Sequence, residues 1–398
     1  MSDRISTEAT DGVGGTGLLG RGAEPDLPAY GRGALSDLLP SVLAGLGVAG
    51  GEDRLDLGTA ETVCVLLIDG LGDDLLAEHA DAAPFLSGLR AGPGGRRITA
   101  GFPATTAASL TSLGTGRPPG EHGVMGYEVL VPELDAVLNC LHWDPRVDPR
   151  EFQPTTTVFE TAERAGVAVA QVGPDRFAGT GLTVAALRGG DYLAAETAGE
   201  RVAAAGRHLA GGGPRLTYVY YGDLDATGHR TGVRSWAWRF QLAAADLIAQ
   251  QLAWVLPVGA RLVVTADHGM VDVPHGGRVD LADHPELDAG VAHIAGEPRA
   301  VYVHARPGVA ADVLACWREV LGERFWVRSR DEAVAAGWFG PDVAPYSVGR
   351  IGDVVAAART TTAVVDSRRM KRGLLDLVGL HGSMTPAELG VPLLVHDR

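Results

Sequence analysis

The sequence is poor in basic residues. Its 398 residues include 34 lysines and arginines against 49 aspartates and glutamates, which gives a formal net charge of −15 at pH 7. Non-specific binding to nucleic acids depends on clustered basic charge that releases counterions from the phosphate backbone. We therefore expect no binding to a nucleic-acid polymer.

Long apolar runs and paired cysteines are also missing. No stretch of about 18 apolar residues occurs, so we expect neither a membrane-spanning helix nor a membrane partner. Cys64, Cys140 and Cys316 are widely spaced and form no Cys-x-x-Cys pair, which argues against a disulfide framework and a structural zinc module. Residues 1–26 lack the basic and apolar regions of a secretory signal and predict a flexible leader. Together these features favour a cytoplasmic protein.

The rest of the chain alternates between strand-like and helix-like segments. This alternation predicts an α/β fold, with a largely parallel central sheet and helices on both of its faces. We expect residues 27–398 to form one large domain. Within it, residues 274–350 change in composition and predict a small α/β insertion or cap. Residues 236–255 have apolar side chains at three- and four-residue spacing, which predicts a long amphipathic helix.

Three predicted strands lead into aspartates. Asp69 follows the first strand directly, Asp225 lies shortly after the second, and Asp267 follows the third. In open α/β sheets ligands gather at the carboxyl ends of parallel strands, so we expect these side chains to lie at one edge of the sheet. The three strands are predicted at residues 62–68, 216–221 and 261–266.

Histidines accompany these carboxylates. His229 lies four residues after Asp225, and His268 follows Asp267 directly. His381 lies in a late Gly-Leu-His-Gly-Ser segment. Carboxylate and imidazole groups suit zinc, and ligand sets without cysteine are typical of catalytic zinc. Two divalent metal ions fit this set of residues, with Zn²⁺ favoured and Mn²⁺ or Mg²⁺ as alternatives; such a pair can steady both the attacking and the leaving oxygen in phosphoryl transfer.

Thr106 is the candidate nucleophile. It follows Phe-Pro-Ala-Thr and precedes a predicted helix at residues 107–114. The amino end of a helix favours an anionic oxygen and an incoming phosphate, and a metal ion can lower the pKa of the hydroxyl further. The alternative is that Thr105 and Thr106 only cap the helix, which is the usual role of threonine at such positions.

The order of these segments resembles the alkaline phosphatase superfamily, and within it the nucleotide pyrophosphatase/phosphodiesterase branch. The segments are Asp69, Phe-Pro-Ala-Thr-Thr, Gly-Thr-Gly-Arg-Pro-Pro-Gly-Glu-His-Gly, Asp-x-x-x-His, Thr-Ala-Asp-His-Gly-Met and a late His-Gly. In that branch the nucleophile lies nine residues before the threonine of a Thr-Gly turn, which selects Thr106. Sulfatases of the superfamily have Cys or Ser at this position, so a sulfatase is disfavoured.

The resemblance also implies how the ligands divide between two metal ions. One ion is held by residues that match Asp225, His229 and His381. The other is held by residues that match Asp69, Asp267, His268 and the nucleophile Thr106.

One position departs from the pattern of the branch. Its members usually carry an asparagine that binds a non-bridging phosphate oxygen, five residues after the histidine of the first His-Gly pair, and this chain has Tyr127 there. We expect either the Tyr127 hydroxyl or the amide of Asn139 to make this contact.

The resemblance implies a hydrolase with the catalytic domain of the alkaline phosphatase superfamily. We expect it to cleave a phosphodiester or nucleotide pyrophosphate through a covalent intermediate on Thr106, so that its partner is a small phosphorylated molecule such as a nucleotide. One alternative is a phosphomonoesterase or phosphonate hydrolase of the same superfamily. The other is a catalytically silent metal- or nucleotide-binding protein. The sequence leaves the oligomeric state open.

Overall fold

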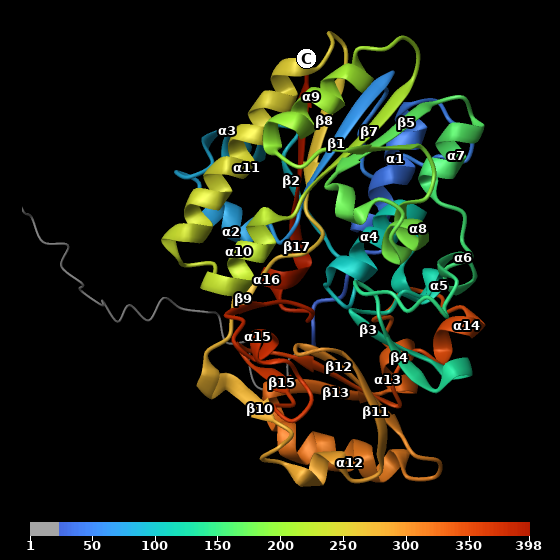
Figure 1. Cartoon of the computed structure of the whole chain (residues 1–398), viewed down its shortest axis with the longest axis vertical. Coiled ribbons are helices and arrows are strands. Elements are labelled where there is room, and N and C mark those ends of the chain that lie inside the picture. The colour runs from blue at the N-terminus through green and yellow to red at the C-terminus, as the bar shows by residue number, and fades with distance from the viewer. Residues whose placement is uncertain (1–23) are drawn as a thin grey trace, which may run out of the picture.

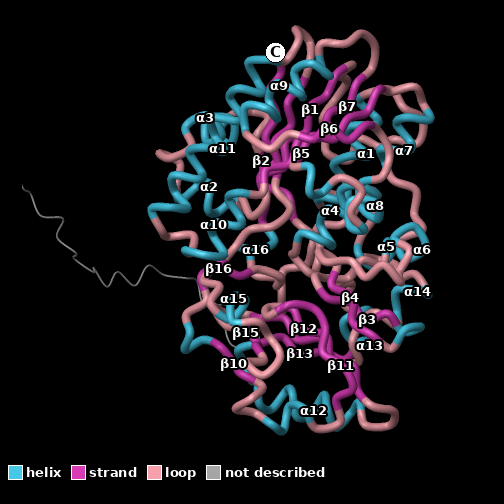
Figure 2. The backbone as a smooth tube through the Cα atoms, viewed as in Figure 1, coloured by secondary structure: helices cyan, strands magenta, loops and turns pink. Residues whose placement is uncertain are grey.

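The computed structural model describes residues 24–398, so the leader predicted at residues 1–26 falls almost entirely outside the described residues. A seven-stranded sheet crosses the upper half of the molecule (Figures 1 and 2). Its strands, in spatial order, are β2 (Arg96–Thr99), β17 (Gly390–Asp397), β8 (Arg261–Thr265), β1 (Thr62–Ile68), β7 (Arg215–Tyr221), β5 (Ala168–Gly173) and β6 (Asp191–Ala194).

The five strands from β8 to β6 are parallel, and only β17 pairs antiparallel with its neighbours β8 and β2. β1 lies in the middle, and its residues from Val63 to Ile68 are all buried. A continuous apolar strand of this kind is expected where both faces of a parallel sheet are covered.

Helices cover both faces of this sheet, one group on each side in Figure 1. The predicted fold class is therefore confirmed, and the predicted long helix coincides with α11 (Trp236–Val255). One group is α2 (Asp73–Glu78), α3 (Pro84–Ala91), α9 (Ala198–Leu209), α10 (Asp223–Thr231) and α11 (Trp236–Val255). The other is α1 (Leu38–Gly45), α4 (Thr106–Thr115), α7 (Val158–Arg164) and α8 (Gly181–Leu187).

A second, antiparallel sheet forms the lower half of the molecule (Figure 1). Its strands, in spatial order, are β13 (Phe325–Ser329), β14 (Val354–Ala358), β12 (Ala300–Ala305), β11 (Val291–Glu297), β3 (Glu128–Val131) and β4 (Ala136–Asn139). Two small pairs are β10 (Arg278–Asp280) with β15 (Ala363–Val365), and β9 (Val271–Asp272) with β16 (Gly379–Leu380). The remaining α-helices are α5 (Pro119–His122), α6 (Pro149–Phe152), α12 (Ala310–Leu321), α13 (Arg330–Ala335), α14 (Pro345–Val348), α15 (Arg372–Leu375) and α16 (Pro386–Leu389).

The predicted insertion at 274–350 contributes β10 to β13 and α12 to α14. The same lower sheet also uses β3, β4 and β14, whose residues lie outside that range. Two parts of the chain, residues 128–139 and 291–358, therefore build this sheet, and a cap confined to 274–350 stays a prediction.

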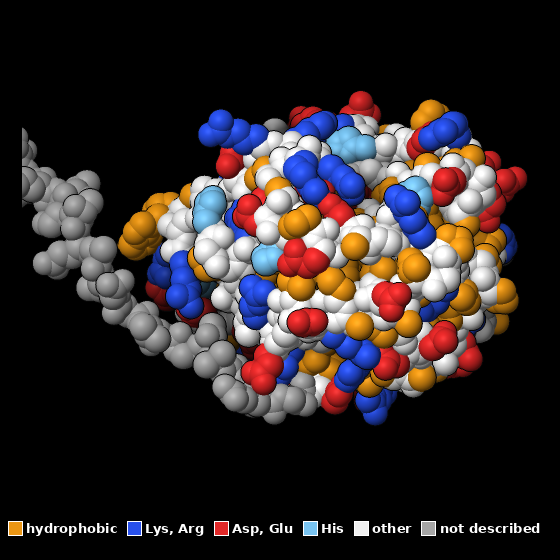
Figure 3. All heavy atoms as spheres, turned by 90° about the horizontal axis from the view of Figure 1, so that it is seen from below, with side chains coloured by type: hydrophobic (Ala, Val, Ile, Leu, Met, Phe, Trp, Pro, Cys, Tyr) orange, Lys and Arg blue, Asp and Glu red, His pale blue; other side chains and the backbone are white. Residues whose placement is uncertain are grey.

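The lower end of the molecule carries mixed charge. Figure 3 shows acidic and basic side chains interspersed on this face, without a continuous basic area. Among residues 24–398, no helix combines the length and the apolar character needed to cross a bilayer. The cytoplasmic location stays a prediction.

Candidate active site

The three aspartates meet at the carboxyl edge of the parallel strands. Asp69 directly follows β1, and Asp267 lies just beyond the end of β8, the next strand in the sheet. β7 lies on the other side of β1, and the helix after it, α10, carries Asp225 and His229 one turn apart. Residues four apart share one face of a helix, so both side chains point toward the same edge.

The structure brings together the first predicted set of metal ligands. His229 Nε2 lies 3.3 Å from Asp225 Oδ2, and His381 Nε2 lies 3.9 Å from Asp225 Oδ1. Single ligand atoms from these three residues all lie within 4.8 Å of one another, a spacing that suits one metal ion. His381 reaches the site because β16 pairs with β9, which lies shortly after Asp267.

The second set also forms around one histidine. His268 Nε2 lies 3.5 Å from Asp69 Oδ1 and 3.4 Å from Asp267 Oδ2. Asp225 joins Asp69 and His268 in a second group of ligand atoms within 4.8 Å, so it lies near both predicted metal positions.

Each of the three histidines is oriented by the main chain. Nδ1 hydrogen-bonds a backbone carbonyl in His229 (2.7 Å to Gly379), His268 (3.0 Å to Gly269) and His381 (2.9 Å to Ala104). A carbonyl oxygen only accepts hydrogen bonds, so Nδ1 must carry the proton in each ring. The lone pair on Nε2 is then free, which is the arrangement that metal-binding histidines require.

The carboxylates lack a counter-charge. Asp69 Oδ1, Asp225 Oδ1 and Asp267 Oδ2 are buried and have no hydrogen-bond partner. Burial raises the pKa of Asp225 and of Asp267 to about 7. Burial, followed by the charge of Asp267, raises the pKa of Asp69 well above its usual value. Buried carboxylates of one sign are costly unless a cation neutralises them. The donor set therefore fits divalent metal ions.

Thr106 lies at the edge of this cluster. It is the first residue of α4, and its Oγ1 lies 3.2 Å from His268 Nε2. Thr105 occupies the N-cap position, but its side chain makes no capping hydrogen bond. Capping by Thr105 is therefore not observed, and the Thr106 hydroxyl points to the cluster. Its role as nucleophile stays a prediction.

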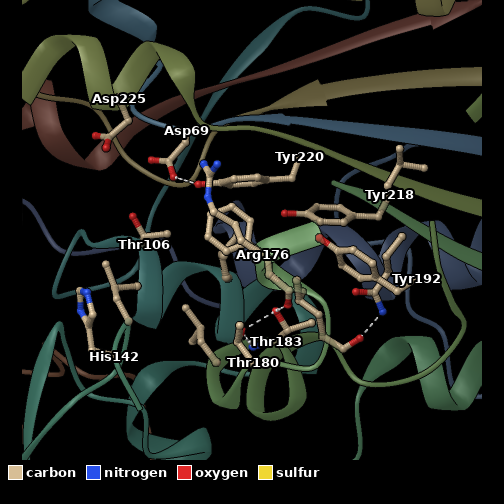
Figure 4. Close-up of a pocket in the computed structure, with 17 residues that line it drawn as sticks. Asp69, Thr106, His142, Arg176, Thr180, Thr183, Tyr192, Tyr218, Tyr220 and Asp225 are labelled. Atoms are coloured by element: carbon tan, nitrogen blue, oxygen red, sulfur yellow. Dashed lines mark hydrogen bonds between the residues drawn. The ribbon is translucent and has the colours of Figure 1, made fainter. Parts of the chain in front are cut away.

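A cavity of about 470 Å³ opens beside Thr106, with Asp69 and Asp225 in its wall (Figure 4). Its other walls are mainly apolar and aromatic. Tyr220 donates a hydrogen bond to Asp69 Oδ2, and Figure 4 shows this contact at the inner edge of the cavity. The other lining residues include Leu110, His142, Gln171, Arg176, Phe177, Thr180, Thr183, Leu187, Tyr192 and Tyr218.

None of these lining residues was predicted from the sequence. Tyr218 and Tyr220 alternate along β7, so their side chains leave the same face of the sheet. This two-residue spacing is visible in the sequence. The contributions of α8 and of the short 3-10 helix Asp175–Phe177 depend on how distant segments pack, and no local signal in the sequence indicates them.

The structure puts Tyr127 and Asn139 near each other but away from this cavity wall. Tyr127 lines a different, smaller cavity of about 140 Å³ together with Glu297. Burial raises the pKa of Tyr127, and a hydrogen bond from Asn139 acts in the opposite direction. Asn139 Oδ1 also accepts the backbone N–H of His142 (3.1 Å). A phosphate contact by either residue stays a prediction.

A buried ion pair supports the loop that carries His381. The guanidinium of Arg299 donates to both oxygens of Glu388, at 2.6 and 2.7 Å, and both side chains are fully buried. Glu388 Oε1 also accepts the backbone N–H of Ser383 at 3.0 Å. Glu388 therefore ties the segment after His381 to Arg299, which precedes β12 in the lower half of the molecule.

Comparison with known proteins gives matches over most of the chain. A family described as type I phosphodiesterase / nucleotide pyrophosphatase matches residues 63–384. Murine ectonucleotide pyrophosphatase/phosphodiesterase 5 has 19% identity and a TM-score of 0.69, over 85% of this chain and 88% of that one. Phosphonoacetate hydrolase from Sinorhizobium meliloti 1021, in complex with phosphonoformate, has 18% identity and a TM-score of 0.65, over 85% and 90%. Among curated proteins, none matches the sequence.

Proposed function

The chain belongs to the type I phosphodiesterase / nucleotide pyrophosphatase family and is a hydrolase of that kind, and on this premise we propose that it cleaves a phosphodiester or nucleotide pyrophosphate through a covalent intermediate on Thr106. The observation that carries the proposal is the position of the Thr106 hydroxyl, 3.2 Å from His268 Nε2 at the mouth of a cavity whose wall includes Asp69 and Asp225.

Asp225, His229 and His381 would hold one divalent ion, and Asp69, Asp267, His268 and Thr106 would hold the other. Zn²⁺ suits this mixture of carboxylates and imidazoles, and Mn²⁺ or Mg²⁺ are alternatives. Two such ions lower the pKa of a hydroxyl and balance the charge of the attacking and leaving oxygens.

The residues of the chain then divide the reaction into two steps. The Thr106 oxygen attacks phosphorus while the bond from phosphorus to the leaving oxygen breaks, and the proton of the Thr106 hydroxyl passes to the departing alkoxide or phosphate. The product of this step is a phosphoryl ester of Thr106. Water then attacks the same phosphorus and releases the phosphate monoester, and Thr106 recovers its proton. The amino end of α4 favours the negative charge on the phosphate oxygens.

A relative provides independent support. An inactive threonine-to-alanine variant of the murine ectonucleotide pyrophosphatase/phosphodiesterase 5 has been solved in complex with AMP, with 18% identity to this chain. We propose that this chain likewise acts on a small phosphorylated substrate such as a nucleotide.

The test is the variant Thr106→Ala, with bis-nitrophenyl phosphate as substrate and the bound metal measured in parallel. We expect turnover to fall on the order of 10³-fold or more with metal content unchanged, because the nucleophile is lost and the other ligands remain. Ser109→Ala is the matched control: its hydroxyl lies in the same helix and is buried without a partner. Near-normal turnover in Thr106→Ala would show that the nucleophile is another group.

The same assay separates the alternatives. Faster hydrolysis of mono-nitrophenyl phosphate than of the diester would identify a phosphomonoesterase, and hydrolysis of phosphonoacetate would identify a phosphonate hydrolase. Bound metal without turnover of any of these substrates would identify a silent binding protein.

A further inference from the structure

The cavity beside Thr106 extends along the face of the large sheet. Tyr220 lies at the end near Asp69, and Tyr218 lies two residues earlier on β7, about 7 Å further from the metal site. Gln171 on β5 is paired in register with Tyr218, so the two side chains are neighbours on the same face of the sheet. Figure 4 shows the hydroxyl ends of Tyr218 and Tyr220 directed toward the side on which Thr106 lies.

The far end of this cavity holds two buried polar atoms without a partner. The Tyr218 hydroxyl and Gln171 Oε1 make no hydrogen bond, although the two residues are only 2% and 4% exposed. Gln171 Nε2 donates to the carbonyls of Leu187 and Gly189, and these bonds fix the amide with Oε1 as its free acceptor. A buried polar group without a hydrogen-bond partner destabilises the folded protein. This indicates that a bound ligand supplies hydrogen-bond partners to the Tyr218 hydroxyl and to Gln171 Oε1.

We propose that Tyr218 and Gln171 determine specificity by binding the far end of the organic group that stays esterified to phosphorus. This inference rests on the proposed hydrolysis at Thr106. Aromatic and apolar walls, including Phe177, Leu187 and Tyr192, suit a planar ring. Gln171 Oε1 accepts an N–H or O–H from the edge of that ring, and the Tyr218 hydroxyl pairs with a neighbouring polar atom.

The test compares Tyr218→Phe with wild type on two esters that share one leaving group, thymidine nitrophenyl phosphate and methyl nitrophenyl phosphate. We expect kcat/KM to fall about 3- to 10-fold for the thymidine ester and to stay unchanged for the methyl ester, which does not reach Tyr218. Tyr221→Phe is the control, because Tyr221 lies on the same strand and its hydroxyl contacts Gln241 on the opposite face.

Equal changes for the two esters, or no change for either, would overturn the specificity role. Calorimetric binding of thymidine monophosphate tests the same contact without turnover. An affinity equal to wild type in Tyr218→Phe overturns the inference, and weaker binding supports it. Absence of turnover in the wild type, with binding retained, counts against the proposed hydrolysis alone.

A second inference comes from the outer face of α11. The inner face of this helix is buried, through residues such as Leu242, Ile248 and Leu252. The outer face is also apolar, unlike the amphipathic helix predicted from the sequence, and α11 lies on the outside of the molecule in Figure 1. Its large side chains and their exposed fractions are Trp236 71%, Phe240 68%, Leu247 51%, Trp254 76% and, just beyond the helix, Val258 90%.

These side chains are arranged symmetrically about Leu247. Phe240 and Trp254 lie seven residues before and after it, and Trp236 and Val258 lie eleven residues before and after it. The other exposed positions between Trp236 and Trp254 are Ala, Ala and Gln. At the edge of this face, the guanidinium of Arg239 lies over the Trp236 ring and is paired with Asp81. An antiparallel copy of the helix on a twofold axis through Leu247 therefore opposes Phe240 with Trp254, as a self-complementary interface requires.

The exposed apolar area is of the size that a stable dimer needs. With about 250 Å² for a whole tryptophan and proportionately less for the smaller side chains, the five residues expose about 700 Å². The largest patch on a typical monomer is about 300–600 Å², and a standard interface buries about 800 Å² per partner. We propose that a second copy of this chain covers the outer face of α11.

Light scattering coupled to size-exclusion chromatography tests this interface. We expect the wild type at about 10 µM to show twice the chain mass of 41.4 kDa, and Leu247→Glu to show a single chain with an unchanged circular-dichroism spectrum. Leu134→Glu is the control, since Leu134 is an exposed leucine outside α11. A monomeric wild type, or a dimer that persists in Leu247→Glu, would overturn the proposal. So would a monomer that binds vesicles of anionic lipid through this face.

Discussion

Replacement of Tyr220 by phenylalanine tests how much the hydrogen bond from Tyr220 to Asp69 contributes to the affinity for metal. Asp69 Oδ2 accepts a hydrogen bond from the Tyr220 hydroxyl, Asp69 Oδ1 has no hydrogen-bond partner, and Asp69 is 2% exposed. A hydrogen bond to a charged group contributes about 1.5–3 kcal/mol, and about 1.4 kcal/mol corresponds to a factor of ten. We therefore expect Tyr220→Phe to bind Zn²⁺ about 10- to 100-fold more weakly, the range observed when partners of metal ligands are removed.

The affinity is measured by competition with a chromophoric chelator, and kcat/KM is measured in parallel at saturating Zn²⁺. Tyr221→Phe provides the control on the same strand, because its hydroxyl faces Gln241 and not the site. We expect that variant to keep the wild-type affinity. If Tyr220→Phe holds Zn²⁺ within twofold of wild type, Asp69 does not depend on this hydrogen bond and the argument is wrong.

Three further predictions concern stability and pH. Arg299→Met should lower the free energy of unfolding by about 3–5 kcal/mol in urea titrations, because Glu388 is left charged and buried; a loss under 1 kcal/mol would contradict this. Gly70→Ala should cost at least about 1–2 kcal/mol and reduce the bound metal measured by elemental analysis, since Gly70 has φ +75° and an added Cβ would lie 3.0 Å from Asp225 Cβ. With the metal removed by a chelator, the pKa of Asp225 in the folded protein is about 7, far above its value in the unfolded chain. The free energy of unfolding of the metal-free protein therefore falls as the pH rises toward 7 and Asp225 becomes charged. Asp225→Asn should match wild type in melting temperature near pH 4, exceed it near pH 8, and lose this advantage when Zn²⁺ is added; an advantage that does not grow with pH would refute the reasoning.

The sequence predicts the upper half of the molecule well. The strand before Asp69 and helix α11 lie at the predicted residues, because continuous apolar runs and regular helical spacing are strong local signals. The lower sheet is different. It joins β3 and β4 to strands more than 150 residues later in the chain, and pairing between such distant segments leaves no local pattern.

The candidate site divides in the same way. Metal ligands are short motifs with fixed spacing, so Asp225 and His229 could be named together, and the structure gathers all six predicted aspartates and histidines. The cavity residues could not be named, because Arg176 and Tyr218 line the same cavity only when a short 3-10 helix and a strand pack around it.

By itself, the sequence determined the fold class, the family resemblance and the candidate ligands, since these depend on residue types and on their spacing along the chain. Only the tertiary structure decided which backbone carbonyls orient the three imidazoles, which carboxylate oxygens remain without a partner, and which tyrosines line the cavity. Those properties depend on distances of a few ångströms between segments that are remote in sequence. The outer face of α11 lies between the two cases, because its apolar residues are visible in the sequence but their exposure is not.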